Sequence, residues 1–598
     1  RYNVSYTYAE AALIIDKIQK LLIDNNIGSN DTVSVFVERN HWVLLSNLAV
    51  LSVGASYVPI DENHPINRMK YMVENSNSKA IITTNHFQNR VDELIEELDS
   101  TPTVINVSSL SESVGELNSL NYHNPTDNDV ACILFTSGTT GNPKAVQVGR
   151  HSIANMVSYY RHNSNFTSDD VYDVFASVGF DISLQHYVAL LTGGSVIWIP
   201  NDIKLNIRKL NEYFIKYVVT HTIITTQVSK LFVQSIDYTS IKNLCAVGEK
   251  LGAVTPPENY AFIDVYGPTE ATSSMTSINV RDKIDDSSVG GPDWNTKIYV
   301  LASHQRRVPF GAVGELYISG YQVSKGYLNN PEANRKAFFN NPFDGEIQGY
   351  ETMYKTGDVV RLLPDGTVGF IGRNDSQVKI RGNRVELSEI ESAIRKIDYV
   401  TDITVQTIKH DANNEIVAYV VVNNDLDEIE LKYSICDHVS KYKPEYMVPS
   451  YVIKLDEIPL NVNGKVDKRA LPDVDRDSLY AEYVAPRDEN EKEIVEAFEK
   501  ALDLDKISIY DDFIRLGGDS LIAIKLLNYI ESDDITIADI FTFRTPEAIA
   551  RNMSEFSFDL DIYSLEAGCP LNSAQINVLA DVNIYNKVNA YHMPNYIS

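Results

Sequence analysis

The sequence has little cysteine. Only four cysteines occur in 598 residues, and no two are close enough in the chain to form a CxxC pair. This spacing argues against a zinc site and against a disulfide framework, and it is typical of a reducing compartment, so we expect a cytoplasmic protein. The four are Cys132, Cys245, Cys436 and Cys569.

Long apolar runs and positive charge are scarce as well. No segment reaches the roughly 18 consecutive apolar residues of a membrane helix, so we expect no membrane partner. Lysine and arginine number 52 against 81 aspartate and glutamate, which gives a formal net charge of −29. Such a surface repels a phosphate backbone, so nucleic acid is not expected as a partner.

The length predicts several domains, because a single hydrophobic core rarely grows to 598 residues. Up to about residue 370, helical patterns alternate with short apolar runs, which predicts an α/β fold with a largely buried sheet. The runs are TVSVFV (32–37), AIITT (80–84), SVIWI (195–199) and HTIITT (221–226).

The pattern changes near residue 375. DSQVKIRGNRVE, DITVQTI and EIVAYVVVN predict strands, and LSEIESAIRKI predicts an amphipathic helix that begins at Ser388 with acids in its first turn. These elements indicate a small α+β unit that ends near Leu471. Residues 472–483 have the proline and charge content of a linker. From Asn490 to about Glu555 the pattern is almost wholly helical, with one loop at DDFIRLGGDS.

A glycine-rich segment, TSGTTGNPK, follows the apolar run CILF; residues 136–144 are called the phosphate loop below. Glycine allows backbone N–H groups to turn inward and cradle phosphate oxygens, hydroxyl groups add donors, and a lysine adds positive charge. The spacing differs from GxxxxGK[ST], so a polar turn between strands is the alternative. The residues concerned are Thr136, Ser137, Gly138, Thr139, Thr140, Gly141 and Lys144.

This motif is one of eight segments that together cover nearly all of residues 5–471. They are LSVGASYVPID (51–61), TSGTTGNPK (136–144), FDIS (180–183), VYGPTE (265–270), GELYISG (314–320), YKTGD (354–358), GRNDSQVKIRGNRVE (372–386) and NGKVDK (463–468). In content and order they resemble the adenylate-forming superfamily, specifically the adenylation domains of nonribosomal peptide synthetases. The resemblance implies a large α/β core over residues 1–374, a smaller lid over 376–471 and a hinge at Asp375.

The resemblance also implies that ATP and Mg²⁺ are used to activate a carboxylate. It places adenine on Tyr266, Mg²⁺ on Glu270 and the ribose on Asp358 and Arg373, and it gives Lys465 a catalytic role between substrate carboxylate and nucleotide. Thr136 and Lys144 join the catalytic set. Further nucleotide contacts are implied for the phosphate loop and for Asp264, Gly267, Thr269 and Arg384.

Two departures from the family pattern stand in this set. The loop reads Pro143-Lys144-Ala145 where the family usually has glycine last, and Asp264 replaces a usual asparagine. A carboxylate at position 264 can still accept a hydrogen bond from the adenine amino group, but it cannot donate one.

Asp181 lies inside an apolar run, and the resemblance gives it the substrate α-ammonium group. A buried carboxylate is costly without a partner, which favours a cationic ligand. The alternative is a helix N-cap, because a helical pattern follows. The implied side-chain pocket is lined by Ile182, Gln185, Cys245, Val247, Val265, Ser273 and Ser274, with Ile223 or Ile224 completing it. This lining favours a neutral side chain of small or medium size.

DDFIRLGGDSL resembles the signature of a carrier domain, in which Ser520 receives 4′-phosphopantetheine from a phosphopantetheinyl transferase. We expect Ser520 at the start of a helix, where a phosphodiester anion is favoured. The resemblance implies an all-α four-helix domain over residues 484–556, called the carrier below.

Residues 565–598 resemble the truncated start of a condensation domain, so further synthetase modules are expected as neighbours. Two other functions stay open. A stand-alone acyl-CoA synthetase is disfavoured by Asp181 and the carrier, and a catalytically dead scaffold is disfavoured by Lys144, Glu270, Asp358 and Lys465.

Overall fold

The structure is a computed structural model. It describes residues 4–110, 126, 129–138, 142–302, 305–374, 377–380, 383–410, 413–424, 426, 428–459, 466–468, 470–474, 483–502, 504, 506–514, 516, 518, 520–530 and 535–556. Of the sequence predictions, the hinge Asp375, Lys465 and the condensation-like segment 565–598 lie outside these residues.

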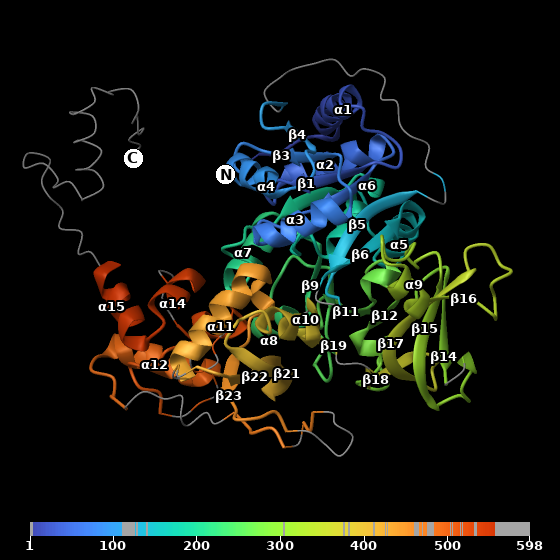
Figure 1. The fold of residues 1–598 in the computed structure, drawn as a ribbon. Helices are drawn as coiled ribbons and strands as arrows, with labels where there is room; N and C mark the ends of the chain where they lie inside the picture. Colours follow the sequence, from blue (N-terminus) through green and yellow to red (C-terminus); the bar gives the residue numbers. More distant parts are fainter. Residues whose placement is uncertain are drawn as a thin grey trace, which may run out of the picture.

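The first sheet of the core has six strands and is mostly parallel (Figure 1). Its first two predicted runs, at 32–37 and 80–84, form buried strands as expected. The strand order is β4 (Thr103–Asn106), β3 (Ala80–Thr83), β1 (Thr32–Phe36), β2 (Ser56–Pro59), β5 (Val130–Thr136) and β6 (Lys144–Gly149). Its helices are α1 (Tyr8–Asp24), α2 (His41–Ser52), α3 (Ile66–Asn75) and α4 (Gln88–Glu97).

The second sheet has seven strands, and its first five in sequence are parallel. One hydrophobic cluster joins it to the first sheet through helix α5, and a second cluster lies on its opposite face. The order is β13 (Gly291–Pro292), β12 (Thr276–Asn279), β11 (Ala261–Tyr266), β10 (Asn243–Val247), β9 (His221–Thr225), β7 (Val171–Val174) and β8 (Ser195–Trp198). The helices are α5 (Arg150–Asn163), α6 (Tyr187–Thr192), α7 (Ile207–Lys216) and α8 (Thr226–Ser235).

The run at 195–199 is less buried than the sequence suggests. It forms β8, an edge strand whose four residues are exposed or half-buried. An edge strand has a neighbour on one side only, so one flank stays open to solvent.

An antiparallel third sheet completes the core. Its strands are β14 (Thr296–Leu301), β15 (Val313–Gly320), β17 (Thr352–Leu362), β16 (Phe338–Asn340) and β18 (Val368–Arg373), with helix α9 (Pro331–Ala337). The core is therefore α/β, as the sequence predicts.

The lid is an α+β unit, also as predicted. It consists of the hairpin β19 (Gln377–Ile380) and β20 (Asn383–Glu386), then α10 (Leu387–Ile394), β21 (Val400–His410), β22 (Asn413–Val422), α11 (Glu428–Tyr442) and β23 (Tyr451–Lys454). The predicted helix start at Ser388 is wrong by one residue. Strand β20 runs to Glu386, whose extended backbone leads directly into the helix at Leu387, so Ser388 lies inside it.

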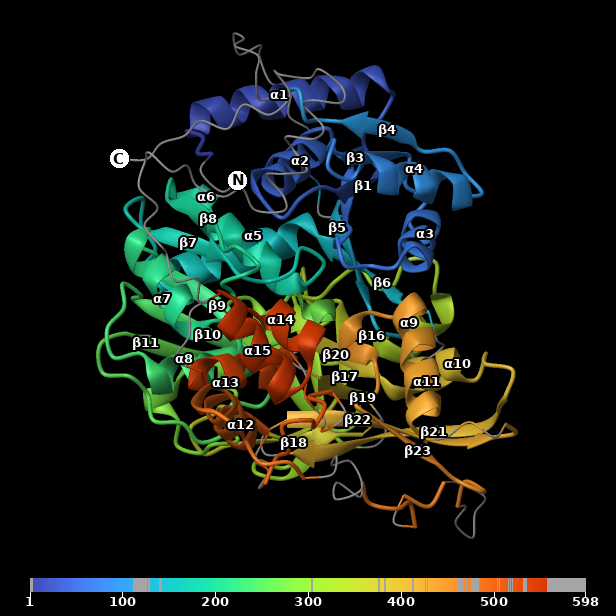
Figure 2. The same ribbon diagram turned by 90° about the vertical axis from the view of Figure 1, so that its left-hand side faces the viewer.

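Four helices are described after the linker. They are α12 (Glu489–Leu502), α13 (Ser520–Tyr529), α14 (Ile537–Phe543) and α15 (Pro546–Phe556), and one hydrophobic cluster draws on all of them. Figures 1 and 2 place them beside the lid. Lys432 of α11 donates to the carbonyl of Ile514 at 3.3 Å, and Arg544 lies 3.5 Å from the hydroxyl of Tyr433, so the lid and the carrier are in contact. None of the described helices is long and apolar enough to cross a membrane.

Gly290 and Gly366 provide a matched test of core packing. Both have positive φ, +91° and +84°, but a Cβ at Gly290 would lie 2.2 Å from the carbonyl oxygen of Ser277, whereas a Cβ at Gly366 would meet nothing within 4 Å. Gly366→Ala should cost about 1 kcal/mol, from backbone strain alone. Gly290→Ala should cost about 2–4 kcal/mol, because the overlap with backbone is added.

Urea unfolding followed by tryptophan fluorescence measures this difference in the core alone, since Trp42, Trp198 and Trp294 all lie there. Equal shifts of the midpoint in the two variants would contradict the packing described here.

Candidate functional site

The phosphate loop begins where strand β5 ends. Thr136 is the last residue of β5, and its hydroxyl oxygen is buried without a hydrogen-bond partner among the described residues. Ser137 donates its hydroxyl to the carbonyl of Arg384 at 2.7 Å, and the Gly138 N–H donates to Glu389 at 3.2 Å. Both acceptors belong to the lid. Thr139, Thr140 and Gly141 lie outside the described residues.

Gly138 has no room for a side chain. A Cβ there would lie 2.1 Å from the carbonyl oxygen of Asn142, so the loop closes tightly on itself at this point. Lys144 begins β6 on the far side of the loop, with its Nζ 4.0 Å from a carboxylate oxygen of Glu386 and 5.5 Å from the ring centroid of Tyr327. The structure thus brings Thr136, Ser137, Gly138 and Lys144 to one end of the first sheet.

Glu270 is fully buried in a short 3-10 helix, Thr269–Ala271. Nη1 of Arg384 lies 2.8 and 2.7 Å from its two oxygens, and the Tyr327 hydroxyl donates to it at 2.6 Å. Burial raises the pKa of Glu270, but the Arg384 charge and the Tyr327 hydrogen bond outweigh it and leave the pKa lowered. The group is therefore an ionised carboxylate.

A buried, ionised carboxylate is the ligand type that Mg²⁺ prefers, so Glu270 fits the metal role that the sequence implies. In the described structure Arg384 contacts both of its oxygens. The described residues hold no cluster of three or more His, Cys, Asp or Glu side chains that could bind a metal without help from a ligand.

Tyr266 and Asp358, two of the implied nucleotide contacts, meet in the structure. The Tyr266 hydroxyl donates to Asp358, and Nη1 of Arg373 lies 2.6 Å from the other oxygen of the same carboxylate. The Nζ of Lys379, from the lid strand β19, lies 5.7 Å from the centroid of the Tyr266 ring. A tyrosine ring, a carboxylate and two cations therefore share one corner of the site.

Asp264 has a partner that sequence reasoning missed. Nζ of Lys283 lies 2.6 Å from its carboxylate, and both side chains are buried. Burial raises the pKa of Asp264, while the charge of Lys283 opposes that shift. The negative charge that Asp264 adds, relative to the asparagine usual in the family, is thus neutralised inside the protein. Gly267, three residues on, packs against the backbone of Ser273 and Ser274, where a Cβ would approach within 2.7 Å.

Asp181 begins a 3-10 helix, Asp181–His186, that runs into α6. The N-cap alternative is wrong, because the capping position is Phe180 and Asp181 lies inside the helix. Its carboxylate is buried and accepts the Thr269 hydroxyl at 2.6 Å. Burial raises the pKa of Asp181 to about 6, partly offset by that hydrogen bond. Thr269, expected among the nucleotide contacts, thus contacts Asp181 here.

The implied pocket residues are brought together on one face of the second sheet. Ile223 pairs in register with Cys245 and shares its hydrophobic cluster, whereas Ile224 belongs to the cluster on the opposite face, so the geometry favours Ile223. Ile182, Val247 and Val265 join the same cluster as Ile223. Gln185 accepts from the Tyr172 hydroxyl at 3.1 Å, and its Nε2 is buried without a partner in the described structure.

A further buried carboxyl, that of Asp293, contacts one of these implied pocket residues. Ser274 donates its hydroxyl to Asp293 at 2.5 Å, and burial raises the pKa of Asp293 to about 6. Ser273 adopts a left-handed backbone, φ +71°, and its hydroxyl is buried without a described partner. The sequence around Asp293 contains no motif that identifies it as a site residue, because its contact with Ser274 depends on the fold.

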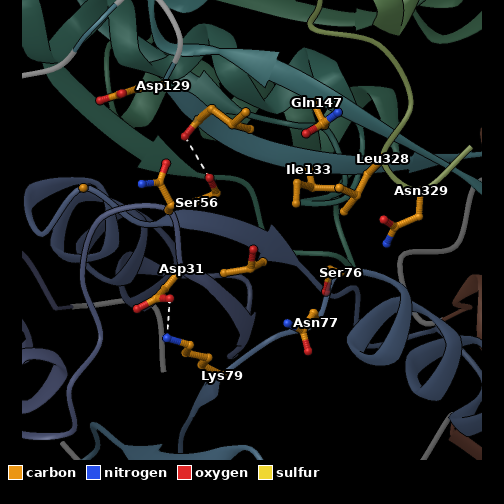
Figure 3. A pocket seen from close by; sticks show the side chains of 14 residues that line it. Asp31, Ser56, Ser76, Asn77, Lys79, Asp129, Ile133, Gln147, Leu328 and Asn329 are labelled. Carbon is orange, nitrogen blue, oxygen red and sulfur yellow. Dashed lines mark hydrogen bonds and ion pairs between the residues drawn. The ribbon is translucent and has the colours of Figure 1, made fainter. Parts of the chain in front are cut away.

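Two cavities lie away from the phosphate loop. One, of about 360 Å³ (Figure 3), is bordered by Thr32, Ser56 and Val130, the residues that begin strands β1, β2 and β5. The phosphate loop follows the opposite end of β5. Ligands of open α/β sheets bind at the carboxyl ends of strands. The second, of about 250 Å³, has Cys245, one of the implied pocket residues, in its lining.

Ser520 is the first residue of helix α13, so the expected position at a helix start is confirmed. Gly518, two residues before Ser520, has no room for a side chain. A Cβ there would lie 2.4 Å from the carbonyl oxygen of Phe513.

The chain is similar to known proteins in sequence and in fold. Three family models match: "AMP-binding enzyme" over residues 1–328, "AMP-binding enzyme C-terminal domain" over 389–465 and "Phosphopantetheine attachment site" over 492–553. Bacitracin synthase 1 of Bacillus licheniformis is 33% identical over 531 residues, which cover 88% of this chain and 10% of that protein. Gramicidin S synthase 1 of Brevibacillus brevis is 33% identical over 542 residues, 89% of this chain and 48% of that protein.

A solved structure of a four-domain nonribosomal peptide synthetase bound to AMP and glycine matches 92% of this chain and 41% of its own, with a TM-score of 0.53 and 29% identity. The chain spans about a tenth and about half of the length of the two synthases named above. The first family model covers more than half of the 598 residues. The chain belongs to the AMP-binding enzyme family.

Proposed function

We propose that this chain activates an amino acid with ATP as an aminoacyl adenylate, releasing pyrophosphate, and transfers the aminoacyl group to a phosphopantetheine thiol on its own carrier. One observation carries the proposal. The buried carboxylates of Asp181 and Glu270 are linked by one short helix. Thr269, which donates its hydroxyl to Asp181, is adjacent to Glu270 in that helix. This arrangement supports an ammonium site next to a metal site.

The proposed domains follow the sequence boundaries: core 1–374, hinge Asp375, lid 376–471, linker 472–483 and a four-helix carrier 484–556, with the start of a condensation domain at 565–598. The phosphopantetheine signature and the multimodular relatives support a transferase and neighbouring modules as partners.

The first step requires no general base, because the substrate carboxylate is already ionised. One of its oxygens attacks the α-phosphorus of ATP, and the bond to pyrophosphate breaks. Positioning and neutralisation of charge carry the rate. We assign Thr136, the phosphate-loop N–H groups and Lys144 to the phosphates, and Mg²⁺ on Glu270 to charge neutralisation. Lys465 would bridge the substrate carboxylate and the nucleotide.

In the second step the thiol of the carrier arm loses its proton, its sulfur attacks the acyl carbon, and AMP leaves. The lid contacts support assigning the described lid position to this step. Arg384 reaches Glu270 and Glu389 reaches Gly138, so the lid strand and helix occupy the place where a triphosphate would lie. Rotation about Asp375 would interchange this position with one that brings Lys465 to the nucleotide.

ATP–pyrophosphate exchange over a panel of amino acids and plain carboxylic acids tests the function. We expect exchange with a neutral amino acid of small or medium side chain, because the proposed pocket presents no unpaired charge. Exchange with carboxylic acids alone would identify an acyl-CoA synthetase, and no exchange with any acid would identify a scaffold. Strongest exchange with arginine, glutamate or tryptophan would contradict the pocket assignment.

The raised pKa of Asp181 gives a pH dependence. An ammonium group pairs only with the ionised carboxylate, and a pKa of about 6 means that protonation sets in below about pH 6. The KM for the amino acid should therefore rise about tenfold per pH unit below that value, while the KM for ATP changes little. Asp181→Asn should raise the amino-acid KM at pH 7.5 and flatten the dependence, which steady-state exchange kinetics from pH 5 to 8 would measure.

An unchanged pH profile in Asp181→Asn would assign the titration to another group. Asp293, which titrates in the same range, provides the control, because Asp293→Asn leaves the Asp181 carboxylate in place.

Carrier loading supplies a separate prediction. Incubation with coenzyme A and a phosphopantetheinyl transferase should add one arm to the chain, and Ser520→Ala should gain no mass in intact-protein mass spectrometry. Ser508→Ala is a suitable control, because Ser508 is buried in the same domain and its hydroxyl accepts the N–H of Val484. A modified Ser520→Ala chain would place the arm elsewhere.

A further inference from the structure

Two buried polar groups of the implied side-chain pocket have no hydrogen-bond partner among the described residues. They are Nε2 of Gln185 and the hydroxyl of Ser273, whose residues are 0% and 1% exposed. A buried donor without a partner is costly, so native structures keep few of them. Both groups belong to the set that the proposed function assigns to the substrate side chain, and that side chain would supply the missing partner.

Tyr172 sets the orientation of the Gln185 amide. The Tyr172 hydroxyl donates to Oε1 of Gln185 at 3.1 Å, so the carbonyl end of the amide is occupied and its NH₂ end is left over. Burial raises the pKa of Tyr172 well above its ordinary value, so the hydroxyl keeps its proton and remains a donor. What Gln185 offers to a ligand is therefore an N–H donor.

Ser274 has the opposite character. Its hydroxyl donates to Asp293 at 2.5 Å. Burial raises the pKa of Asp293 only to about 6, so at pH 7.5 this group is a carboxylate and takes the proton of the Ser274 hydroxyl. The Ser274 oxygen is left as an acceptor, whereas the hydroxyl of Ser273 can donate or accept.

The second cavity connects these two hydrogen-bonding arrangements. Tyr172, which holds Gln185, lines it, and so does Ser277, whose hydroxyl donates to the other oxygen of Asp293 at 3.4 Å. Cys245 of the implied pocket lies in the same lining. The groups that fix the donor and the acceptor thus border one space around Cys245.

A carboxamide complements this set of groups. Its carbonyl oxygen accepts from Gln185 and Ser273, and its NH₂ group donates to Ser274. A hydroxyl group has a single oxygen and cannot fill all three positions. An aliphatic side chain would leave the buried groups unpaired, and an acidic one would be repelled by Asp293.

We propose that the substrate is an amino acid with a carboxamide side chain, bound by Gln185, Ser273 and Ser274, and that Tyr172 is a positioning residue that fixes the Gln185 amide. The inference rests on the proposed function and names its substrate class. Tyr172 acts on the substrate through Gln185, so its loss should change selectivity between side chains more than the rate of the chemical step.

Side chains of similar size and different polarity test the substrate class on the unmodified chain. ATP–pyrophosphate exchange at pH 7.5 compares asparagine with leucine and aspartate, and glutamine with methionine and glutamate. We expect kcat/KM for one of the two carboxamides to exceed that of its apolar analogue by about 100-fold or more, because the analogue leaves buried polar groups unpaired.

Strongest exchange with an aliphatic, hydroxyl-bearing or acidic amino acid would overturn the inference and leave the proposed function standing. Exchange with no amino acid at all would refute both.

Tyr172→Phe tests the positioning role, because it removes the hydroxyl and keeps the ring. The Gln185 amide can then turn, so the preference for the carboxamide over its apolar analogue should fall about tenfold. The loss should appear as a higher KM for the carboxamide, with a much smaller change in kcat and in the KM for ATP. An unchanged preference, or an equal loss of kcat with every substrate, would refute this role of Tyr172.

Tyr213→Phe is the matched control. The Tyr213 hydroxyl donates to the carbonyl of Trp198 at 3.1 Å, and its ring packs against the cluster on the opposite face of the second sheet. The same kind of bond is lost away from the pocket, so the preference should equal that of the unmodified chain.

Gln185→Leu covers the case in which Tyr172→Phe fails to fold. It removes the donor itself and should shift the preference toward the apolar analogue. A Gln185→Leu chain that still prefers the carboxamide by the original ratio would overturn the proposal.

Discussion

The carboxylate of Glu270 has no exposed surface, and it therefore needs a cation beside it at all times, because an unpaired buried charge costs several kcal/mol. In the described structure that cation is Arg384 of the lid. If the lid turns away, as proposed above, the charge must be met by something else, and the proposed Mg²⁺ would meet it. The ionic contact between Arg384 and Glu270 thereby couples the position of the lid to what is bound beside Glu270.

The other buried carboxylates of the site fall into two groups by the same rule. Asp264 has a permanent cation in Lys283, so its charge is settled within the core. Asp181 and Asp293 have hydroxyl donors instead, and burial raises the pKa of each to about 6. A carboxylate without a permanent cation is ready to accept a positively charged ligand. Of these two, Asp181 accepts the hydroxyl of Thr269, the residue next to Glu270.

Much of the fold could be predicted from the sequence, and the motifs identified residues that the structure brings together, such as Thr136, Lys144 and Glu270. The alternation of runs before residue 370, the lid strands and the helix beginning at Ser520 follow from local patterns. The partners of those residues could not be predicted. Glu389 contacts Gly138 across 251 positions of chain, and Asp293, Tyr327 and Lys283 lie near no motif. Such contacts depend on how strands and subdomains pack, which local periodicity does not encode.

The pairing of Asp264 with Lys283 restricts how this site can diverge. Asparagine at 264 alone would leave a buried ammonium without a counter-ion, and loss of the lysine alone would leave a buried carboxylate in the same condition. Removing one partner of a buried pair costs about 3–5 kcal/mol, which is a large part of the stability of a domain. Lineages that carry this pair should therefore keep both residues or exchange both. In an alignment of close relatives, positions 264 and 283 should change together, although they are not adjacent in the sequence.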